Sequence, residues 1–397
     1  MKSSQNKIPK ICIVTPEYPP ENWGGLARTV HRVSIHARDM DLEVHVAHFK
    51  VHPHHVVLLD DNRMSEFVDS IRVHRIIVGK EEVSATSREL WDCPHTLTLR
   101  MMYQSLEILH RQEQFDLFHS FFLYPVGYVT GMLAKRYQLP EIVTLVGNDI
   151  KKYIFSPEKV ATCKSGLETA DKVVALSQDM VDMANALTPI RDKARVIFNA
   201  IEIPAESWQA VRNQGQPFKI GCAGIFKYAK GLPYLIKAIA ALRTKHSVTL
   251  ELLGHMRKSE QSVYDEIVRA TGINDGIFFK EAVPHDGIME WLRSLNAFVL
   301  PSVSEGCPNI LMEAMATGVP CVATRTGAVE DLMEDHISGI LVPWGNSLAL
   351  EHSLQELIQD QKSAMSLGLA ARARMKLFSS SRERQEWSKL YGELIDF

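Results

Sequence analysis

Short apolar runs alternate with amphipathic segments in the first half of the chain. Residues 10–15 form a continuous run rich in β-branched side chains, which is typical of a buried parallel strand. A loop with Gly24 and Gly25 follows, and apolar residues then recur at helical spacing over 26–40. Another strand is predicted at 43–48. This order of strand, glycine loop, helix and strand indicates the start of a doubly wound α/β sheet.

The alternation continues along the chain and restarts in its second half. Further strands are predicted at 71–78, 116–120, 142–146, 172–176 and 195–198, with helices at 97–112 and 125–137 and a less regular excursion within 52–97. In the second half, strands are predicted at 218–223, 248–253, 277–279, 297–300, 320–323 and 340–342, with helices at 231–244 and 382–395. We therefore predict two Rossmann-like domains, 1–200 and 218–381, joined by a polar, breaker-rich linker at 201–217. The last helix carries apolar residues, Trp387 and Tyr391 among them, that need a surface to cover.

The composition of the chain argues against some classes of function. The 397 residues are 46% hydrophobic and carry a formal charge of −3, which argues against broad nucleic-acid binding. Six cysteines form no CxxC pair, which favours reduced thiols in a cytoplasmic protein. No stretch approaches the roughly 18 apolar residues of a membrane span. Any membrane contact is therefore expected to be peripheral.

The strongest chemical signal is the segment 304–318. Pro308 suits a first helical position and Gly318 a C-terminal cap, so a helix is predicted over 308–317, directly after a strand. The free amides and dipole of such a helix start form a phosphate site. Glu305 precedes this helix, and Glu313 shares one of its faces with Asn309, so carboxylates are available for sugar and ribose hydroxyls. The alternative is a capping glutamate and a solvated helix glutamate.

Two glycine loops add weaker signals. The loop from Gly224 to Gly231 follows the first strand of the second domain and carries Lys227 and Lys230, which can place ammonium groups on a diphosphate. On its own, this loop favours an ordinary surface turn with solvated lysines. Gly24–Gly25 is not a GxGxxG fingerprint, and the chain has no GxxxxGK[ST] motif. The sequence therefore gives little support to a dinucleotide-dependent oxidoreductase or a P-loop enzyme.

Together these motifs resemble the retaining glycosyltransferases of the large family four. The resemblance rests on SEGCPNILMEAMATGVPCVAT with its two glutamates, and extends to the other glycine loops, to 170–177 and to the closing helix. It covers nearly the whole chain. It implies the GT-B fold, in which two Rossmann-like domains with doubly wound parallel sheets face a deep cleft, and a final helix, 382–397, that crosses back to the first domain.

The resemblance also implies residue roles. Glu313 would bind the donor ribose, and Glu305 would contact hydroxyls of the transferred sugar. Lys230 would neutralise the diphosphate. Gly24 and Gly25 would approach the donor phosphate or the acceptor. The amides around four residues at the helix start would hold the sugar and diphosphate: Gly306, Cys307, Asn309 and Ile310.

Two positions depart from the family pattern. Ile225 stands where the family usually has an arginine, and Lys227 is the candidate replacement charge. The family often has a basic residue, commonly histidine, before Gly-x-Asp at the end of a first-domain strand, and here that residue is Val146. The residue that would contact the donor sugar or acceptor from that side is then either lost or replaced by Asn148 or Asp149.

The predicted activity is transfer of a hexose from a nucleotide diphosphate sugar to a hydroxyl acceptor, with retention and without a metal or cofactor. The acceptor is a glycan, a lipid-linked sugar or a small molecule. No general base is evident, which fits front-face attack with the leaving phosphate oxygen taking the acceptor proton. Two alternatives remain: a GT-B nucleotide-sugar epimerase and a non-catalytic nucleotide-sugar-binding protein.

Other polar patterns favour ordinary surface structure. His52, His54 and His55 lack ligands that would complete a metal site, so a solvated loop is preferred. Asp39-Met40-Asp41 resembles a metal-binding DxD but lies at a predicted helix end, where turn chemistry explains it. The helix after Gly25 has a basic face for which a solvated surface is preferred, the alternative being a rim for an anionic acceptor or membrane. That face consists of Arg28, His31, Arg32, His36 and Arg38.

Overall fold

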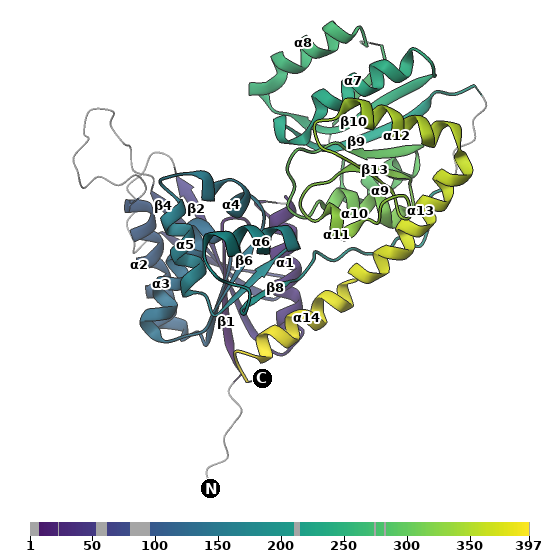
Figure 1. Cartoon of the computed structure of the whole chain (residues 1–397). Coiled ribbons are helices and arrows are strands. Elements are labelled where there is room, and N and C mark those ends of the chain that lie inside the picture. Colours follow the sequence, from purple (N-terminus) through teal and green to yellow (C-terminus); the bar gives the residue numbers. More distant parts are fainter. Residues whose placement is uncertain are drawn as a thin grey trace, which may run out of the picture. The chain divides into compact units, whose positions relative to one another are not determined.

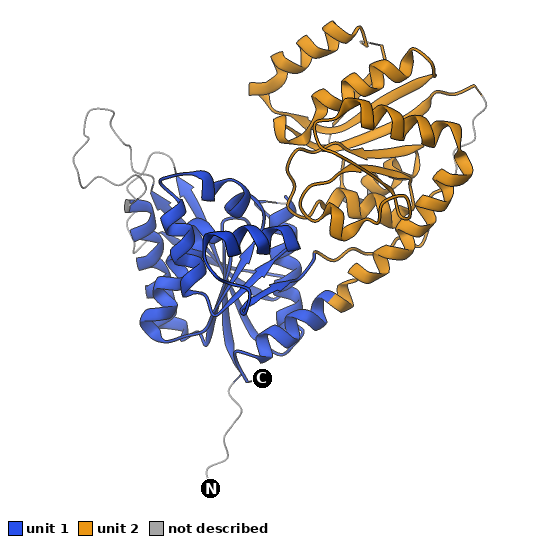
Figure 2. Ribbon diagram, in the orientation of Figure 1, with its two compact units in different colours: residues 1–198, 383–397 blue, residues 199–382 orange. Residues whose placement is uncertain are grey.

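The computed structural model describes residues 8–22, 24–52, 62–79, 96–209, 215–273, 275–281 and 283–396. The chain divides into two compact units (Figure 2). Unit 1 comprises Met1–Phe198 and Glu383–Phe397, and unit 2 comprises Asn199–Arg382. None of the helices in the described part combines the length and apolar character that crossing a membrane requires. No disulfide joins the cysteines of the described residues, and Cys93 lies outside them.

Unit 1 is built on a sheet with the strand order β3-β4-β2-β1-β5-β6-β7-β8. Its strands are β1 (Lys10–Thr15), β2 (Glu43–His52), β3 (Arg63–Val68), β4 (Ile71–Gly79), β5 (Leu117–Phe121), β6 (Glu141–Leu145), β7 (Lys172–Ala175) and β8 (Ala194–Val196). All neighbouring strands pair in parallel except β3, which runs antiparallel to β4. The crossovers therefore leave the carboxyl ends of the parallel strands along one edge of the sheet.

Helices cover both faces of this sheet (Figure 1). They are α1 (Gly25–Arg38), α2 (Thr96–Glu113), α3 (Tyr128–Tyr137), α4 (Asn148–Lys151), α5 (Val160–Thr169), α6 (Gln178–Leu187) and α14 (Ser380–Gly392). Ile11 and Ile13 of β1 pack with α1 and α14, whereas Cys12 and Val14 pack with α2 and α3. Period-two alternation along a strand that is buried on both faces produces the continuous apolar run seen in the sequence.

Unit 2 repeats the design with six parallel strands in the order β11-β10-β9-β12-β13-β14. The strands are β9 (Phe218–Phe226), β10 (Val248–Met256), β11 (Ile277–Lys280), β12 (Ala297–Leu300), β13 (Cys321–Thr324) and β14 (Ile340–Val342). The helices are α7 (Leu232–Arg243), α8 (Gln261–Thr271), α9 (His285–Arg293), α10 (Asn309–Thr317), α11 (Val329–Leu332), α12 (Ser347–Gln359) and α13 (Gln361–Met375). The predicted class, two doubly wound α/β domains, is confirmed.

Several local expectations change. Strand β3 was not predicted, because its side chains are mostly exposed or half-buried and give no apolar run. The rest of the irregular excursion, 53–61 and 80–95, lies outside the described residues, as do His54 and His55. Helix α10 begins at Asn309 with Pro308 as its N-cap, since Pro308 is extended with ψ 96°.

The basic face of α1 is not a solvated surface, so that expectation was wrong. Arg32 donates two hydrogen bonds to the Glu383 carboxylate, at 2.6 and 2.9 Å, and His36 lies 3.1 Å from the same group. Glu383 belongs to α14 and its side chain is only 3% exposed. His31 contacts Asp69 at 2.9 Å. Arg32 and His36 of this face thus anchor the last helix.

Glu141, at the start of β6, is fully buried, and neither of its carboxyl oxygens has a hydrogen-bond partner among the described residues. Burial raises the pKa of this carboxyl well above its usual 4.5, Asp171 raises it further, and Lys193 opposes the shift. A raised pKa means that the folded state holds a proton that the unfolded state has lost. Stability should therefore fall as pH rises from about 4.5 towards the folded-state pKa.

We expect Glu141→Gln to reduce this pH dependence, because the amide does not titrate. Melting temperatures of both proteins, measured between pH 5 and pH 8, test the expectation. The melting temperature should fall less across that pH range in the variant than in wild type. Equal falls in the two proteins would show that Glu141 does not hold its proton in the folded state.

Candidate functional site

Two loops meet at the carboxyl ends of the adjacent strands β9 and β12 in unit 2. The backbone N–H groups of Val303 and Ser304 donate to the carbonyl of Ala229, at 2.8 and 3.4 Å. Gly231 has a left-handed φ of 64°, and a Cβ there would overlap the carbonyl oxygen of Pro301. Glycine is therefore required for the β9 loop to reach the β12 loop.

This contact brings Lys230 and Glu305 together. The Lys230 ammonium donates to Oε1 of Glu305 at 2.6 Å, and the hydroxyl of Ser302 donates to the same oxygen at 2.6 Å. The two charged side chains are 18% and 11% exposed, so the pair is accessible but largely shielded from water. Two residues selected separately from the sequence thus form one ion pair. Ser302, which orients the carboxylate, was missed.

A third loop, after β13, supports the segment around Glu305. The Glu305 N–H donates to the Thr326 hydroxyl at 3.3 Å, and the Ala328 N–H donates to the Gly306 carbonyl at 2.9 Å. Gly327 has φ 58°, and a Cβ there would overlap the Glu305 carbonyl oxygen. Thr326 and Gly327 were also missed. The signal that could have identified them is their position directly after a strand that ends at the same edge of the sheet.

Helix α10 starts directly after this segment. Gly306, Cys307, Asn309 and Ile310 are all partly exposed around its first turn, and the Asn309 amide oxygen accepts from Asn199 at 2.8 Å. The helix has no side-chain cap. Its first N–H groups therefore form the positive end of a helix dipole, four residues after the glutamate that holds the Lys230 ammonium. Such a helix start suits an anion.

Neither glutamate matches the alternative of capping and solvated side chains. Glu305 makes no cap hydrogen bond to α10. Glu313 lies in the second turn and is only 2% exposed. The solvated interpretation of Glu313 was therefore wrong. Burying a carboxylate costs free energy unless it is ion-paired or hydrogen-bonded. The ribose contact itself stays a prediction.

Ile225, which departs from the family pattern, and Lys227, the candidate replacement charge, differ in exposure. Ile225 is 62% exposed near the end of β9, and Lys227, which precedes the turn Tyr228–Lys230, is half-buried. The replacement of the missing arginine by Lys227 stays a prediction.

In unit 1, Gly24 and Gly25 are exposed at the start of α1, after the carboxyl end of β1. The loop before them is held by the buried Arg75 guanidinium, which donates to the Tyr18 carbonyl at 3.3 Å and to the Pro19 carbonyl. The glycine turn thus sits on a fixed loop at the sheet edge where α/β proteins bind ligands. Contact of these glycines with phosphate or acceptor stays a prediction.

The two candidates after β6 differ sharply. Asn148 is exposed. Asp149 is fully buried, and its carboxylate accepts hydrogen bonds at 2.8 to 3.2 Å from the backbone N–H groups of Leu123, Val146, Gly147 and Ile150. Such a carboxylate organises the surrounding backbone and has no accessible surface for a substrate. The expectation of a substrate contact by Asp149 therefore conflicts with its burial, and Asn148 remains the candidate.

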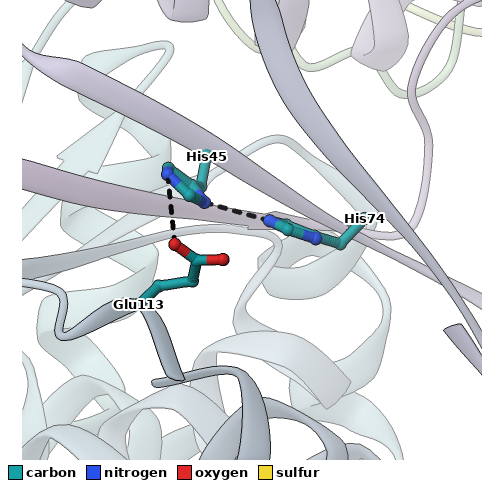
Figure 3. A group of neighbouring side chains, drawn as sticks. All are labelled: His45, His74 and Glu113. Atoms are coloured by element: carbon teal, nitrogen blue, oxygen red, sulfur yellow. Dashed lines mark hydrogen bonds and ion pairs between the residues drawn. The ribbon is translucent and has the colours of Figure 1, made fainter. Parts of the chain in front are cut away.

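A further polar cluster lies near the amino-terminal ends of β1 and β2 (Figure 3). His45 Nδ1 lies 3.0 Å from His74 Nε2, while His45 Nε2 faces Glu43 at 3.1 Å and Glu113 at 4.0 Å. His74 Nδ1 is 2.8 Å from the Ser65 hydroxyl. Burial lowers the pKa of both histidines, that of His74 to about 3. Neutral imidazoles are potential metal ligands.

Cations of the protein already occupy the surroundings of this cluster. The Lys10 ammonium lies 2.9 Å from Glu43 and 3.8 Å from Glu113, and Arg72 contacts Glu113 at 3.3 Å. Both ring nitrogens of His45 and of His74 also have hydrogen-bond partners. The arrangement therefore favours a neutralised structural network over a metal site.

Two sequence profiles match the chain in succession. The profile described as Glycosyltransferase Family 4 matches residues 23–203, and that described as Glycosyl transferases group 1 matches residues 217–360. The chain belongs to the family-four glycosyltransferases. The resemblance seen in the sequence motifs is thereby confirmed.

Relatives and solved structures agree with this assignment. The glycosyltransferase is 22% identical to N-acetyl-alpha-D-glucosaminyl L-malate synthase of Bacillus anthracis over 345 residues, 84% of this chain and 87% of that protein. Sucrose-phosphate synthase from Thermosynechococcus elongatus matches with a TM-score of 0.80 at 20% identity, covering 97% of this chain and 99% of that one. HepE of Anabaena in complex with UDP-glucose matches with a TM-score of 0.75 at 18% identity, covering 97% of this chain and 100% of that one. The GT-B fold is thus confirmed.

Proposed function

We propose that this glycosyltransferase moves a hexose from a nucleotide diphosphate sugar to a hydroxyl acceptor, with retention of configuration and without a metal or cofactor. The observation that carries the proposal is the Lys230–Glu305 pair at the start of α10. The pair brings the Lys230 ammonium to the segment that leads into α10, and an ammonium and the first amides of a helix both suit a diphosphate. The UDP-glucose in the HepE complex supports testing uridine nucleotides first.

Each side chain has a role that its geometry supports. Lys230 and the first amides of α10 stabilise the diphosphate as negative charge develops on it. Glu305, held through Oε1 by Ser302 and Lys230, accepts hydrogen bonds from sugar hydroxyls. Glu313 accepts from the ribose. These donors supply positive charge from the protein itself, which supports the proposal that no metal is needed.

The proposed reaction balances without a protein base. The bond between the sugar anomeric carbon and the phosphate oxygen breaks, and a bond from that carbon to the acceptor oxygen forms on the same face. The acceptor proton passes to the departing phosphate oxygen. The protein contributes mainly by positioning the two reactants and stabilising the leaving group.

A thermal-shift panel of UDP, GDP, ADP and TDP tests donor binding. A nucleotide that binds the folded protein should raise its melting temperature by mass action. We expect one of the four to give a clear rise at millimolar concentration. If all four leave the melting temperature unchanged, the proposed function is wrong.

Glu313→Ala should weaken binding of that nucleotide by about tenfold or more, because a hydrogen bond to a charged group is lost. Calorimetric titration measures the dissociation constant. Glu330→Ala is the matched control, since Glu330 is an exposed residue of α11 in the same unit. Unaltered affinity in folded Glu313→Ala would remove Glu313 from the site.

Product analysis separates the proposed transferase from its rivals. An epimerase would change the donor sugar without any acceptor, whereas a transferase needs the acceptor hydroxyl. A non-catalytic protein is made possible by Ile225 and Val146, which stand at the two positions that depart from the family pattern. Tight donor binding without turnover on any acceptor would support that alternative.

A further inference from the structure

Aromatic side chains gather where two neighbouring strands of unit 1 end. Phe122 and Tyr124 follow β5, and Tyr153 and Phe155 follow β6. Because both strands are parallel, both crossovers leave the sheet at its carboxyl edge. The order of strands changes direction between β1 and β5, so the loop after β5 borders the position at which α/β sheets bind ligands.

Lys159 is held by two of these rings. Its ammonium lies 4.2 Å from the centre of the Tyr153 ring and 5.2 Å from that of Tyr124. The two tyrosine rings meet edge to face, with their centres 5.9 Å apart, and Phe122 packs against Tyr153 at 6.0 Å. Cation–π contacts at these distances fix a long side chain in one place.

The loops that carry this cluster are joined to each other. The buried Asp149 carboxylate accepts from the Leu123 N–H at 3.1 Å and from the Ile150 N–H at 3.1 Å, which links the loop after β5 to the loop after β6. Phe122 adopts φ 96°, a conformation that is costly for a residue with a side chain. Such conformations persist where the surroundings impose them, often at ligand sites.

The charge of Lys159 is matched by aromatic rings and not by an acid. Among the residues that the structure describes, no carboxylate lies within ion-pair distance of its ammonium. Lys151, on α4, instead pairs with Asp179 at 2.6 Å. An ammonium surrounded by rings is partly desolvated and gains strongly from an anion that it can contact.

The tyrosines add hydrogen-bond donors and apolar surface. Burial is the main factor that raises the pKa of both Tyr124 and Tyr153, so their hydroxyls stay protonated at neutral pH and can donate to anion oxygens. Phe155 is 72% exposed beside them. Aromatic faces with a few convergent polar groups are typical of small-molecule sites.

We propose that Lys159, Tyr124 and Tyr153 bind the anionic group of the acceptor, a sugar or polyol that carries a phosphate or carboxylate. The rings and Phe155 then cover its apolar face, while a hydroxyl remains available for transfer. This inference rests on the proposed function, because it assigns the acceptor side of the same reaction.

Binding of inorganic phosphate, glucose 6-phosphate and glucose to the full chain tests the inference. Dissociation constants come from calorimetric titration of each probe. We expect wild type to bind glucose 6-phosphate and phosphate more tightly than glucose. Lys159→Gln should weaken glucose 6-phosphate binding by about tenfold or more, because a charge-assisted contact is lost. Lys159→Arg should retain most of the affinity.

Lys164→Gln is the matched control, since Lys164 lies on α5 and pairs with Glu168 at 3.7 Å. It should leave every dissociation constant unchanged. If Lys159→Gln lowers the melting temperature, Tyr153→Phe, which keeps the ring and removes one donor, replaces it in the comparison. Equal affinity for glucose 6-phosphate in wild type and the Lys159 or Tyr153 variant would overturn the inference, as would failure of wild type to bind either phosphate probe.

The nucleotide panel distinguishes the two proposals. Lys159→Gln should show the same nucleotide-induced rise in melting temperature as wild type, because Lys159 belongs to unit 1 and the proposed nucleotide site to unit 2. Nucleotide binding without Lys159-dependent anion binding overturns this inference alone. Anion binding without any nucleotide response overturns the proposed function instead.

Discussion

Lys230→Ala should lower kcat/KM for sugar transfer by about 10²-fold or more, the loss typical of removing one preorganised donor to developing charge. The effect is expected to be large because Glu305 lies 2.6 Å from the Lys230 ammonium. Without Lys230, the Glu305 carboxylate faces the diphosphate directly and repels it. Steady-state kinetics with the nucleotide sugar chosen by the thermal-shift panel measure the loss. A change of less than threefold would contradict the diphosphate role.

A double-mutant cycle separates charge donation by Lys230 from repulsion by Glu305. If repulsion contributes, Lys230→Ala combined with Glu305→Gln should lose less activity than the two single losses multiplied together. Lys227→Ala tests whether the second lysine replaces the arginine missing at Ile225. It should have a smaller effect than Lys230→Ala, because Lys230 is the lysine whose ammonium contacts the Glu305 carboxylate, at 2.6 Å.

The sheets could be predicted because their strands are buried on both faces. The bounds 10–15, 297–300 and 340–342 match β1, β12 and β14 residue for residue. A continuous apolar run between polar turns identifies such a strand directly. Strand β3 has one partner and mostly exposed or half-buried side chains, so its pattern contains no comparable signal.

The candidate site could be predicted in its residues but not in its contacts. Glycines and charged residues directly after strands indicated Lys230 and Glu305, which are 75 positions apart. Their ion pair depends on β9 and β12 being neighbours, and strand order is a tertiary property. The contacts of the supporting residues Ser302, Thr326 and Gly327 depend on the same strand order. The cation–π contacts of Lys159 likewise join segments that local periodicity treats as unrelated.

Helical periodicity also cannot show which element covers a polar face. The spacing of Arg32 and His36 places them on one side of α1, where exposed charge is the usual outcome. In the structure α14 covers that side, and the Glu383 carboxylate forms hydrogen bonds with both residues. The sequence distance between α1 and Glu383 exceeds 340 residues, so no local pattern links them. The contact turns a basic surface into an anchor for the last helix.

Glu383→Gln should lower the free energy of unfolding by about 3 kcal/mol, because removing one member of a buried ion pair leaves the other charge uncompensated. Burial alone would raise the Glu383 pKa, but the hydrogen bond from His36 and the charge of Arg32 lower it below its usual 4.5. A lowered pKa means that this stabilisation is present above about pH 4.5 and is lost as pH falls through the folded-state value. Calorimetric melting at pH 7 and pH 4 measures both effects.

The exposed Glu386→Gln change on the same helix is the control and should alter stability by about 0.5 kcal/mol or less. Amide hydrogen exchange adds a local measurement, since weaker docking should speed exchange in α14 before other helices of unit 1. Unchanged exchange in α14 of Glu383→Gln would mean that Trp387, Leu390 and Tyr391, all buried, hold the helix without the ion pair. A loss at pH 7 that disappears towards pH 4 would identify the charge of Glu383, and not its shape, as the anchor.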